Sequence, residues 1–302
     1  MIQGTMTAMI TPFRNGAIDD ERLAENVARQ IAENVDGLVP VGTTGESPTL
    51  SHAEHRQVIE KVVQTANGKT RVIAGTGSNS TSEALELTEH AAEVGADAAL
   101  LVNPYYNKPT QEGLYRHFMT IADKVNLPIV LYNIPGRTNI TMTPQTVARL
   151  ASHPHITGIK EATGSLDIAS EIATLCDPNA FSIISGDDSL TLPLISIGAK
   201  GVISVLSNLI PARVKSMVDA ALSGRFAEAR TIHYSLFPLF KSCLALATNP
   251  IPIKTAMALA GRDTGELRLP LCEMEPQQRA ELNALLETQD LLSRSAAAQH
   301  SS

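Results

Sequence analysis

Lys160 is the residue of this chain with the clearest chemical potential, because it closes a short apolar stretch. The stretch runs from Ile156 to Ile159, and the segment GIKEATG places Glu161 after the lysine and Gly164 in a turn. Lysines are rarely buried, so a solvated strand end is the ordinary interpretation. The alternative is a partly desolvated amine, which loses its proton more readily and can then attack a carbonyl carbon.

Other residues with reactive or hydrogen-bonding side chains also follow short apolar stretches. They are Thr43 and Thr44 in GTTGES, Tyr105 and Tyr106 in NPYYN, Tyr132 and Arg137 in LYNIPGRT, Gly186 to Asp188 in SGDD, and Ser204 in GVISV. If the stretches are strands of a parallel barrel, their carboxyl ends meet at one rim, where such barrels place their chemistry. This convergence favours a nucleophilic Lys160 over a solvated one.

Two other motifs indicate nucleotide or metal binding only weakly. GTGSNS, residues 75–80, lacks the third glycine of a dinucleotide-binding fingerprint, and GTTGES lacks the lysine of a phosphate-binding loop. His52 and His55 stand three residues apart, but as metal ligands they would need further donors. We therefore expect neither a nucleotide nor a metal.

The elements that would position these residues are eight short apolar stretches separated by longer amphipathic segments. The stretches are TMTAMI, DGLVPV, TRVIAG, ADAALLV, LPIVLY, ITGI, AFSII and KGVISV. Most are continuously apolar, which is typical of parallel strands covered on both faces. Eight strand–helix units in succession predict a (β/α)8 barrel.

The ends of the intervening helices carry start and stop signals. Capping boxes are expected at Ser51 with Glu54 and at Ser80 with Glu83, Thr143 should cap a helix that starts at Pro144, and Gly95, Gly198 and Gly224 should end helices. The predicted barrel covers residues 1–224, followed by a small helical appendage over 225–292. The small polar residues 293–302 predict a disordered tail.

The composition narrows the class of protein. The chain has 302 residues and a formal net charge of −7, which argues against the basic face of a nucleic-acid binder. It has no stretch of about 18 apolar residues for a membrane span and no signal peptide pattern. Its three scattered cysteines suggest free thiols in a reducing cytoplasm.

In chain order, seven motifs resemble the dihydrodipicolinate synthase family of pyruvate-dependent class I aldolases. They are GTTGES, NPYYNKPTQEGLYRHF, LYNIPGRT, GIKEATG, SGDD, GVISV and NPIPIK, and the resemblance covers nearly the whole chain. It implies condensation of pyruvate with L-aspartate-4-semialdehyde in lysine and diaminopimelate synthesis. The only cofactor-like species would be a covalent lysine–pyruvate imine.

The resemblance also implies roles for individual residues. Lys160 would form the Schiff base, and Tyr132 would transfer protons through Thr44 to Tyr106 of another subunit. A relay is needed because a free tyrosine has a pKa of about 10. Pyruvate would be bound by Thr43 and Thr44 and by backbone groups of Gly186 and Ile203, while Arg137 would bind the semialdehyde carboxylate.

A second polar cluster resembles the allosteric lysine site of inhibited family members. Its residues are Ser47, His52, His55, Asn79, Glu83 and Tyr105. The alternative is a solvated helix face with two ordinary histidines. The resemblance further implies a homotetramer built from two tight dimers.

Two other functions stay open from the sequence. The chain could cleave a sugar acid, as N-acetylneuraminate lyases do, although those enzymes typically have a serine at the position of Thr43 and lack Arg137. It could also be a catalytically silent binding protein on the same barrel. Pro48, Asn139 and the segment SCLALATNP depart from the family pattern without touching the catalytic set.

Overall fold

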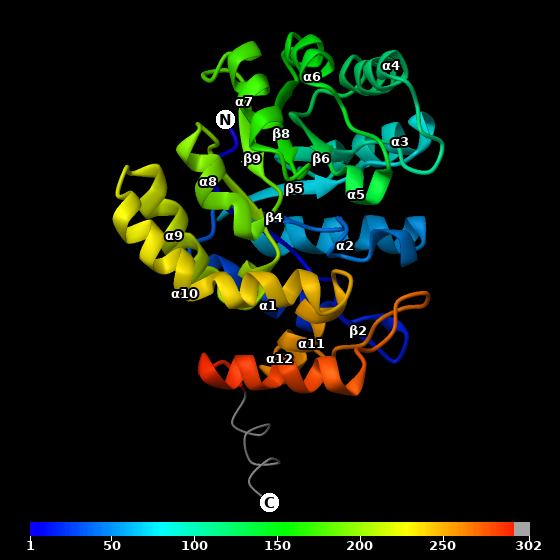
Figure 1. Ribbon diagram of the computed structural model, residues 1–302. Helices are drawn as coiled ribbons and strands as arrows, with labels where there is room; N and C mark the ends of the chain where they lie inside the picture. Colours follow the sequence, from blue (N-terminus) through cyan, green and yellow to red (C-terminus); the bar gives the residue numbers. More distant parts are fainter. Residues whose placement is uncertain (293–302) are drawn as a thin grey trace, which may run out of the picture.

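The computed structural model of this chain describes residues 1–292 and contains the expected barrel (Figure 1). Eight parallel strands close on themselves, because the first strand pairs with both the second and the last. The strands are β1 (Gly4–Ala8), β4 (Gly37–Val39), β5 (Arg71–Gly75), β6 (Ala98–Val102), β7 (Ile129–Asn133), β8 (Ile156–Glu161), β9 (Ser182–Ser185) and β10 (Gly201–Ser204). Each of the eight apolar stretches forms one of them, so the predicted (β/α)8 fold is confirmed.

Helices follow each barrel strand and cover the outside of the barrel. They are α1 (Asp20–Ala32), α2 (His52–Ala66), α3 (Thr81–Glu93), α4 (Gln111–Ala122), α6 (Pro144–Ala151), α7 (Leu166–Leu175), α8 (Thr191–Ser196) and α9 (Pro211–Leu222). The sequence analysis did not predict a small hairpin of β2 (Phe13–Arg14) with β3 (Ala17–Ile18), or the short helix α5 (Pro135–Thr138). The helix α5 matters for the site because it carries Arg137.

Most of the predicted helix ends are confirmed. Ser51 and Glu54 form a full capping box, and Thr143 accepts a hydrogen bond from the backbone N–H of Thr146. The capping box at Ser80 is wrong, because the Ser80 side chain makes no cap hydrogen bond. Glu83 instead binds Ser78 and His52, so a tertiary contact replaces the local one. Gly95, Gly198 and Gly224 follow the last turns of α3, α8 and α9 with φ of 87°, 107° and 78°, a region that favours glycine.

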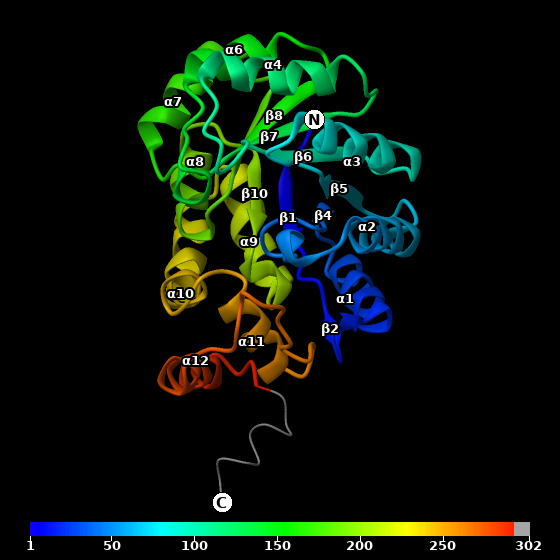
Figure 2. The same cartoon turned by 90° about the vertical axis from the view of Figure 1, so that its right-hand side faces the viewer.

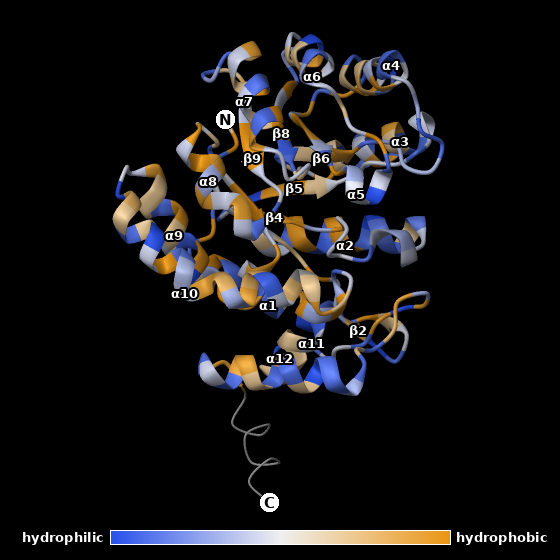
Figure 3. Cartoon of the chain, viewed as in Figure 1, coloured by the Kyte–Doolittle hydropathy of each residue, from blue (hydrophilic) through white to orange (hydrophobic). Residues whose placement is uncertain are grey.

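Two sets of buried side chains hold the barrel together. One lies between the strands and the surrounding helices, and the other fills the barrel interior. Interior side chains include those of Met6, Val39, Ile73, Tyr132 and Ile203. Figure 3 shows the strands carrying mostly apolar residues, while helices such as α12 mix apolar and polar ones. Successive side chains of a strand point alternately into the barrel and outward to the helices, so each strand contributes to both sets of buried side chains.

In the described part of the chain, three helices follow α9: α10 (Phe226–Ala245), α11 (Ile251–Leu259) and α12 (Pro276–Thr288). Both views place α11 and α12 together at one end of the molecule (Figures 1 and 2). We propose that the barrel ends and the helical region begins at residue 224. The segment that joins α10 to α11 nevertheless contacts the rim of the barrel, where Asn249 binds Thr44. The tail predicted over 293–302 lies outside the described residues. Within residues 1–292, no helix is long and apolar enough to cross a membrane.

Candidate active site

Lys160 lies near the carboxyl end of β8 and points into the barrel. Its register partners are Tyr132 on β7 and Ile184 on β9, and both belong to the interior set. The residue is 6% exposed, and its Nζ lies 4.1 Å from the centroid of the Tyr132 ring. Lys160 is thus a buried amine, as the sequence analysis predicted, and it lies over the face of the Tyr132 ring.

Glu161 follows Lys160 in sequence but does not pair with it. Successive side chains of a strand alternate, so Glu161 points out of the barrel, where its Oε1 accepts the N–H of Thr163 (2.6 Å). Burial raises the pKa of the Glu161 carboxyl. The amine of Lys160 therefore faces the interior without its neighbouring carboxylate.

Gly186 leaves the room that the Lys160 side chain needs. A Cβ at this glycine would lie 2.7 Å from Cβ of Ala162 and 3.1 Å from Cε of Lys160. Any larger residue would push against the reactive side chain. Ile203, the other predicted backbone position, lies in β10 and is 1% exposed in the barrel interior.

Thr43 and Thr44 lie in the loop after β4. The loop is flanked by two residues with positive φ, Val41 (49°) and Glu46 (55°), a conformation that non-glycine residues rarely adopt. Such strained backbone concentrates at functional sites. Thr44 is 3% exposed, and its Oγ1 accepts a hydrogen bond from Nδ2 of Asn249 at 3.0 Å.

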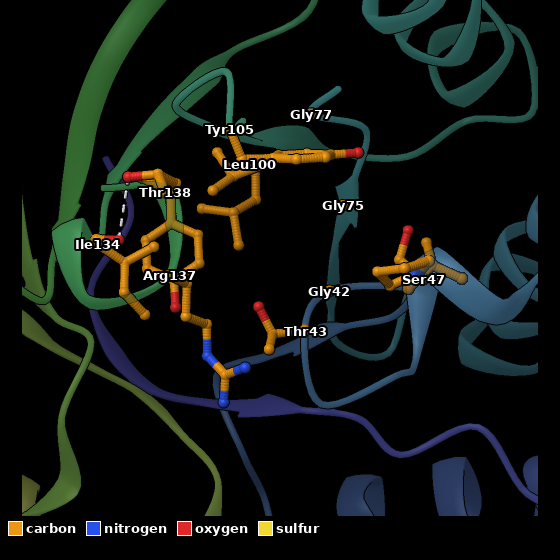
Figure 4. A pocket seen from close by; sticks show the side chains of 14 residues that line it. Gly42, Thr43, Ser47, Gly75, Gly77, Leu100, Tyr105, Ile134, Arg137 and Thr138 are labelled. Atoms are coloured by element: carbon orange, nitrogen blue, oxygen red, sulfur yellow. Dashed lines mark hydrogen bonds between the residues drawn. The ribbon is translucent and has the colours of Figure 1, made fainter. Parts of the chain in front are cut away.

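A pocket of about 230 Å³ opens at this rim, and Thr43, Tyr105, Tyr132 and Arg137 are among its lining residues. Figure 4 shows the Arg137 guanidinium reaching from α5 toward Thr43. Its Nη2 donates to the main-chain oxygen of Asn249 at 3.1 Å, which leaves other guanidinium donors free for a ligand. The pocket thus combines hydroxyl groups with a cation suited to carboxylates, and the ring of its lining residue Tyr132 lies against the Lys160 amine.

Tyr106 differs from the other predicted catalytic residues, Lys160, Tyr132 and Thr44, because its side chain is not buried. Its φ is 73°, and it is 91% exposed in the loop between β6 and α4. Within residues 1–292 it makes no hydrogen bond with Thr44 or Tyr132. Tyr106 therefore forms no hydrogen-bonded relay with these residues in the described part of the chain.

The predicted regulatory residues surround Glu83 and the neighbouring end of the same pocket. Glu83 Oε1 lies 2.6 Å from Nε2 of His52, and its Oε2 accepts a hydrogen bond from Ser78. Burial raises the pKa of the nearby Tyr105, and the negative charge of Glu83 raises it further. His55 is not on a solvated face, since it is 5% exposed and burial lowers its pKa to about 4.

The other two predicted members flank this group. Ser47 lies in the 3-10 turn η1 (Ser47–Thr49) and lines the pocket, whereas Asn79 uses its main-chain oxygen to accept from Nδ2 of Asn107 (2.9 Å).

Sequence reasoning missed three residues beside the site. Asn249 contacts both Thr44 and Arg137, and Glu46 forms a fully buried ion pair with Lys254 (2.7 Å). All three lie in the motifs GTTGES and NPIPIK. The motifs marked the segments as important, but no local pattern indicated that these segments, about 200 residues apart, pack on each other.

A family model described as the dihydrodipicolinate synthetase family matches residues 1–289. The chain belongs to this family. It is 51% identical over 292 residues to the 4-hydroxy-tetrahydrodipicolinate synthase of Citrifermentans bemidjiense, covering 97% of this chain and all of the relative.

Two solved structures of dihydrodipicolinate synthases agree with this assignment. The enzyme of Acinetobacter baumannii, in complex with pyruvate, is 42% identical with a TM-score of 0.93, covering 97% of this chain and 100% of the other. The enzyme of Cyanidioschyzon merolae, with lysine bound, is 40% identical with a TM-score of 0.93, covering 96% and 99%.

Proposed function

We propose that this chain is a 4-hydroxy-tetrahydrodipicolinate synthase, which condenses pyruvate with L-aspartate-4-semialdehyde in lysine and diaminopimelate biosynthesis. The observation that carries the proposal is the buried Lys160 amine beside the ring of Tyr132, which lines a pocket together with Thr43 and Arg137. Family membership over nearly the whole chain supports the same reaction.

The mechanism starts at Lys160. Its neutral amine attacks the keto carbon of pyruvate, and loss of water gives a protonated imine. The imine withdraws electrons, so the pyruvate methyl group loses a proton and an enamine forms. The enamine carbon attacks the aldehyde carbon of the semialdehyde, whose oxygen takes a proton. The amine of the semialdehyde then attacks the imine carbon, closes the ring and releases Lys160.

The remaining residues bind substrates and move protons. Tyr132, whose ring lies against Lys160, donates the proton that allows the keto oxygen to leave as water. Thr44 links the Tyr132 hydroxyl to the hydroxyl of Tyr106 from another subunit. Thr43, Thr44 and the backbone of Gly186 and Ile203 bind pyruvate, and Arg137 binds the second carboxylate. The bond to Lys160 is the only covalent link between enzyme and substrate in this mechanism. We propose that the enzyme needs neither a metal nor nicotinamide, and that it works in the cytoplasm.

The function is tested by offering pyruvate together with either L-aspartate-4-semialdehyde or N-acetylmannosamine. We expect condensation with the semialdehyde alone. Equal or preferred use of the sugar would identify a sugar-acid aldolase, and no turnover with either aldehyde would support a silent binding protein.

Replacing Arg137 with alanine is expected to raise the KM for the semialdehyde by about tenfold or more, because a charge-assisted carboxylate contact is lost. The KM for pyruvate should change little. The matched control is Arg116→Ala, which removes an exposed arginine on α4 that pairs with Glu112. Equal loss for both substrates would mean that Arg137 serves only to hold the Asn249 segment in place.

We propose that the enzyme is a homotetramer of two tight dimers in which Tyr106 of the partner subunit completes the relay through Thr44 and Tyr132. Support comes from the exposure of Tyr106, which makes no hydrogen bond with Thr44 or Tyr132 in the described part of its own chain. Mixing inactive Tyr106→Phe with inactive Lys160→Ala should restore activity, since each hybrid dimer has one complete site. Subunit exchange without any recovery would reject the shared site.

We propose that L-lysine inhibits the enzyme at the cluster of Ser47, His52, His55, Asn79, Glu83 and Tyr105. The Glu83 carboxylate would bind an ammonium group, and Tyr105 adjoins the relay residue Tyr106. Glu83→Ala should raise the half-inhibitory lysine concentration at least about tenfold. Glu86→Ala, on the same helix but paired with Arg56, is the control. Unchanged activity at millimolar lysine would reject the inhibition itself.

A further inference from the structure

Asn249 lies beside two residues of the site, Thr44 and Arg137. It lies in the segment between α10 and α11 and is 7% exposed. Its side-chain Nδ2 donates to Oγ1 of Thr44 (3.0 Å), and its main-chain oxygen accepts from Nη2 of Arg137 (3.1 Å). A single residue of the C-terminal region therefore contacts both a relay hydroxyl and the carboxylate-binding arginine.

The direction of the first hydrogen bond has a chemical consequence. An amide Nδ2 can only donate, so it takes one lone pair of the Thr44 oxygen. The Thr44 proton is then directed to another acceptor, which in the proposed relay is the oxygen of Tyr132. Once Tyr132 has given up its proton, a donor from Thr44 stabilises the resulting oxygen anion and can return a proton.

A buried ion pair fixes Asn249 in this place. Glu46 lies two residues after Thr44, and Lys254 lies five residues after Asn249. Their charged groups meet at 2.7 Å with neither side chain exposed, and Lys254 Nζ also donates to the main-chain oxygen of Thr11 (2.9 Å). The pair joins the same two segments as the Asn249–Thr44 contact, so it fixes their register.

We propose that Asn249 is a positioning residue of this site, which makes Thr44 a proton donor toward Tyr132 while its main chain orients Arg137. The proposal rests on the proposed function of the site. It goes beyond that function by assigning a role in the reaction to the C-terminal NPIPIK segment.

The test replaces Asn249 with aspartate, which has nearly the same shape but offers an acceptor where Nδ2 donates. The Thr44 proton would then turn toward the new carboxylate and away from Tyr132. We expect kcat to fall about 10- to 100-fold, the range for a misplaced catalytic group. Exchange of the pyruvate methyl protons with deuterated solvent, which requires no aldehyde, should slow by a similar factor.

Two further readouts separate positioning from simple loss of stability. The ratio of variant to wild-type kcat should rise as pH falls, because a protonated aspartic acid again donates to Thr44. In combination with Thr44→Val, the Asn249→Asp change should cost little more, because both act on one hydroxyl. The control Asn26→Asp changes a buried asparagine of α1 outside the site and should lower thermal stability without slowing the exchange.

Three outcomes would overturn the proposal. They are unchanged methyl exchange in Asn249→Asp, full additivity with Thr44→Val, and a rise in the KM of the semialdehyde as the sole defect. Wild-type enzyme that exchanges the methyl protons but does not condense the semialdehyde would instead refute the proposed function and leave the role of Asn249 intact.

Discussion

Replacing Lys160 with alanine is expected to reduce condensation by at least about 10⁴-fold, because the proposed reaction starts with an imine on this amine. Lys160→Arg should be equally inactive, since a guanidinium keeps the charge but does not lose its proton to become a nucleophile. Both variants should fold, which circular dichroism and thermal melting will check.

Lys200→Ala provides the control for loss of an amine elsewhere. Lys200 lies immediately before β10, at the opposite end of the strands from the pocket, so the change should leave turnover intact. Substantial activity in Lys160→Ala would contradict the assignment of the nucleophile.

Breaking the buried pair of Glu46 and Lys254 is expected to give the largest loss of stability. Lys254→Met leaves the Glu46 carboxylate without its partner in a site from which water is excluded. Removing one member of such a pair typically costs about 3–5 kcal/mol. The measurement is the free energy of unfolding from urea denaturation.

Two comparison variants make this prediction specific. The double change Glu46→Gln with Lys254→Met should recover much of the loss, because no unpaired charge stays buried. Arg225→Met removes one member of an exposed pair with Glu228, which solvent screens, so it should have little effect. A small effect of Lys254→Met, equal to that of Arg225→Met, would show that water reaches the pair.

The barrel was predictable because local patterns encode it. Each strand is a continuous apolar stretch, and residues such as Gly95 and Ser51 mark the helix ends through their own backbone preferences. Local reasoning failed at Ser80, where the expected capping partner Glu83 binds His52 from a neighbouring helix. There a tertiary contact was more favourable than the local cap.

The candidate site was predictable to the extent that parallel strands bring their carboxyl ends together. That rule placed Lys160 beside Tyr132 and both near the threonine loop. It could not place Asn249, whose contact with Thr44 spans 205 residues and depends on how the C-terminal helices pack. Nor could it indicate that Lys254 is fully buried, since lysine is rarely so and its partner Glu46 is equally remote in sequence.

The role of Tyr106 could not be predicted from local sequence patterns for a different reason. Tyr106 is 91% exposed within one chain, so the relay role that we propose for it requires a second subunit. A pattern within one sequence indicates such a residue only through a family motif.

The central claim is that Lys160 is the amine that forms the imine with pyruvate. Reduction of the enzyme–pyruvate mixture with borohydride, followed by peptide mapping, tests it most directly, because the imine becomes a stable secondary amine on the lysine that formed it. We expect one adduct, on Lys160, in proportion to the loss of activity. An adduct on Lys200 or Lys254 instead, or complete inactivation with Lys160 unmodified, would contradict the assignment of Lys160 as the nucleophile.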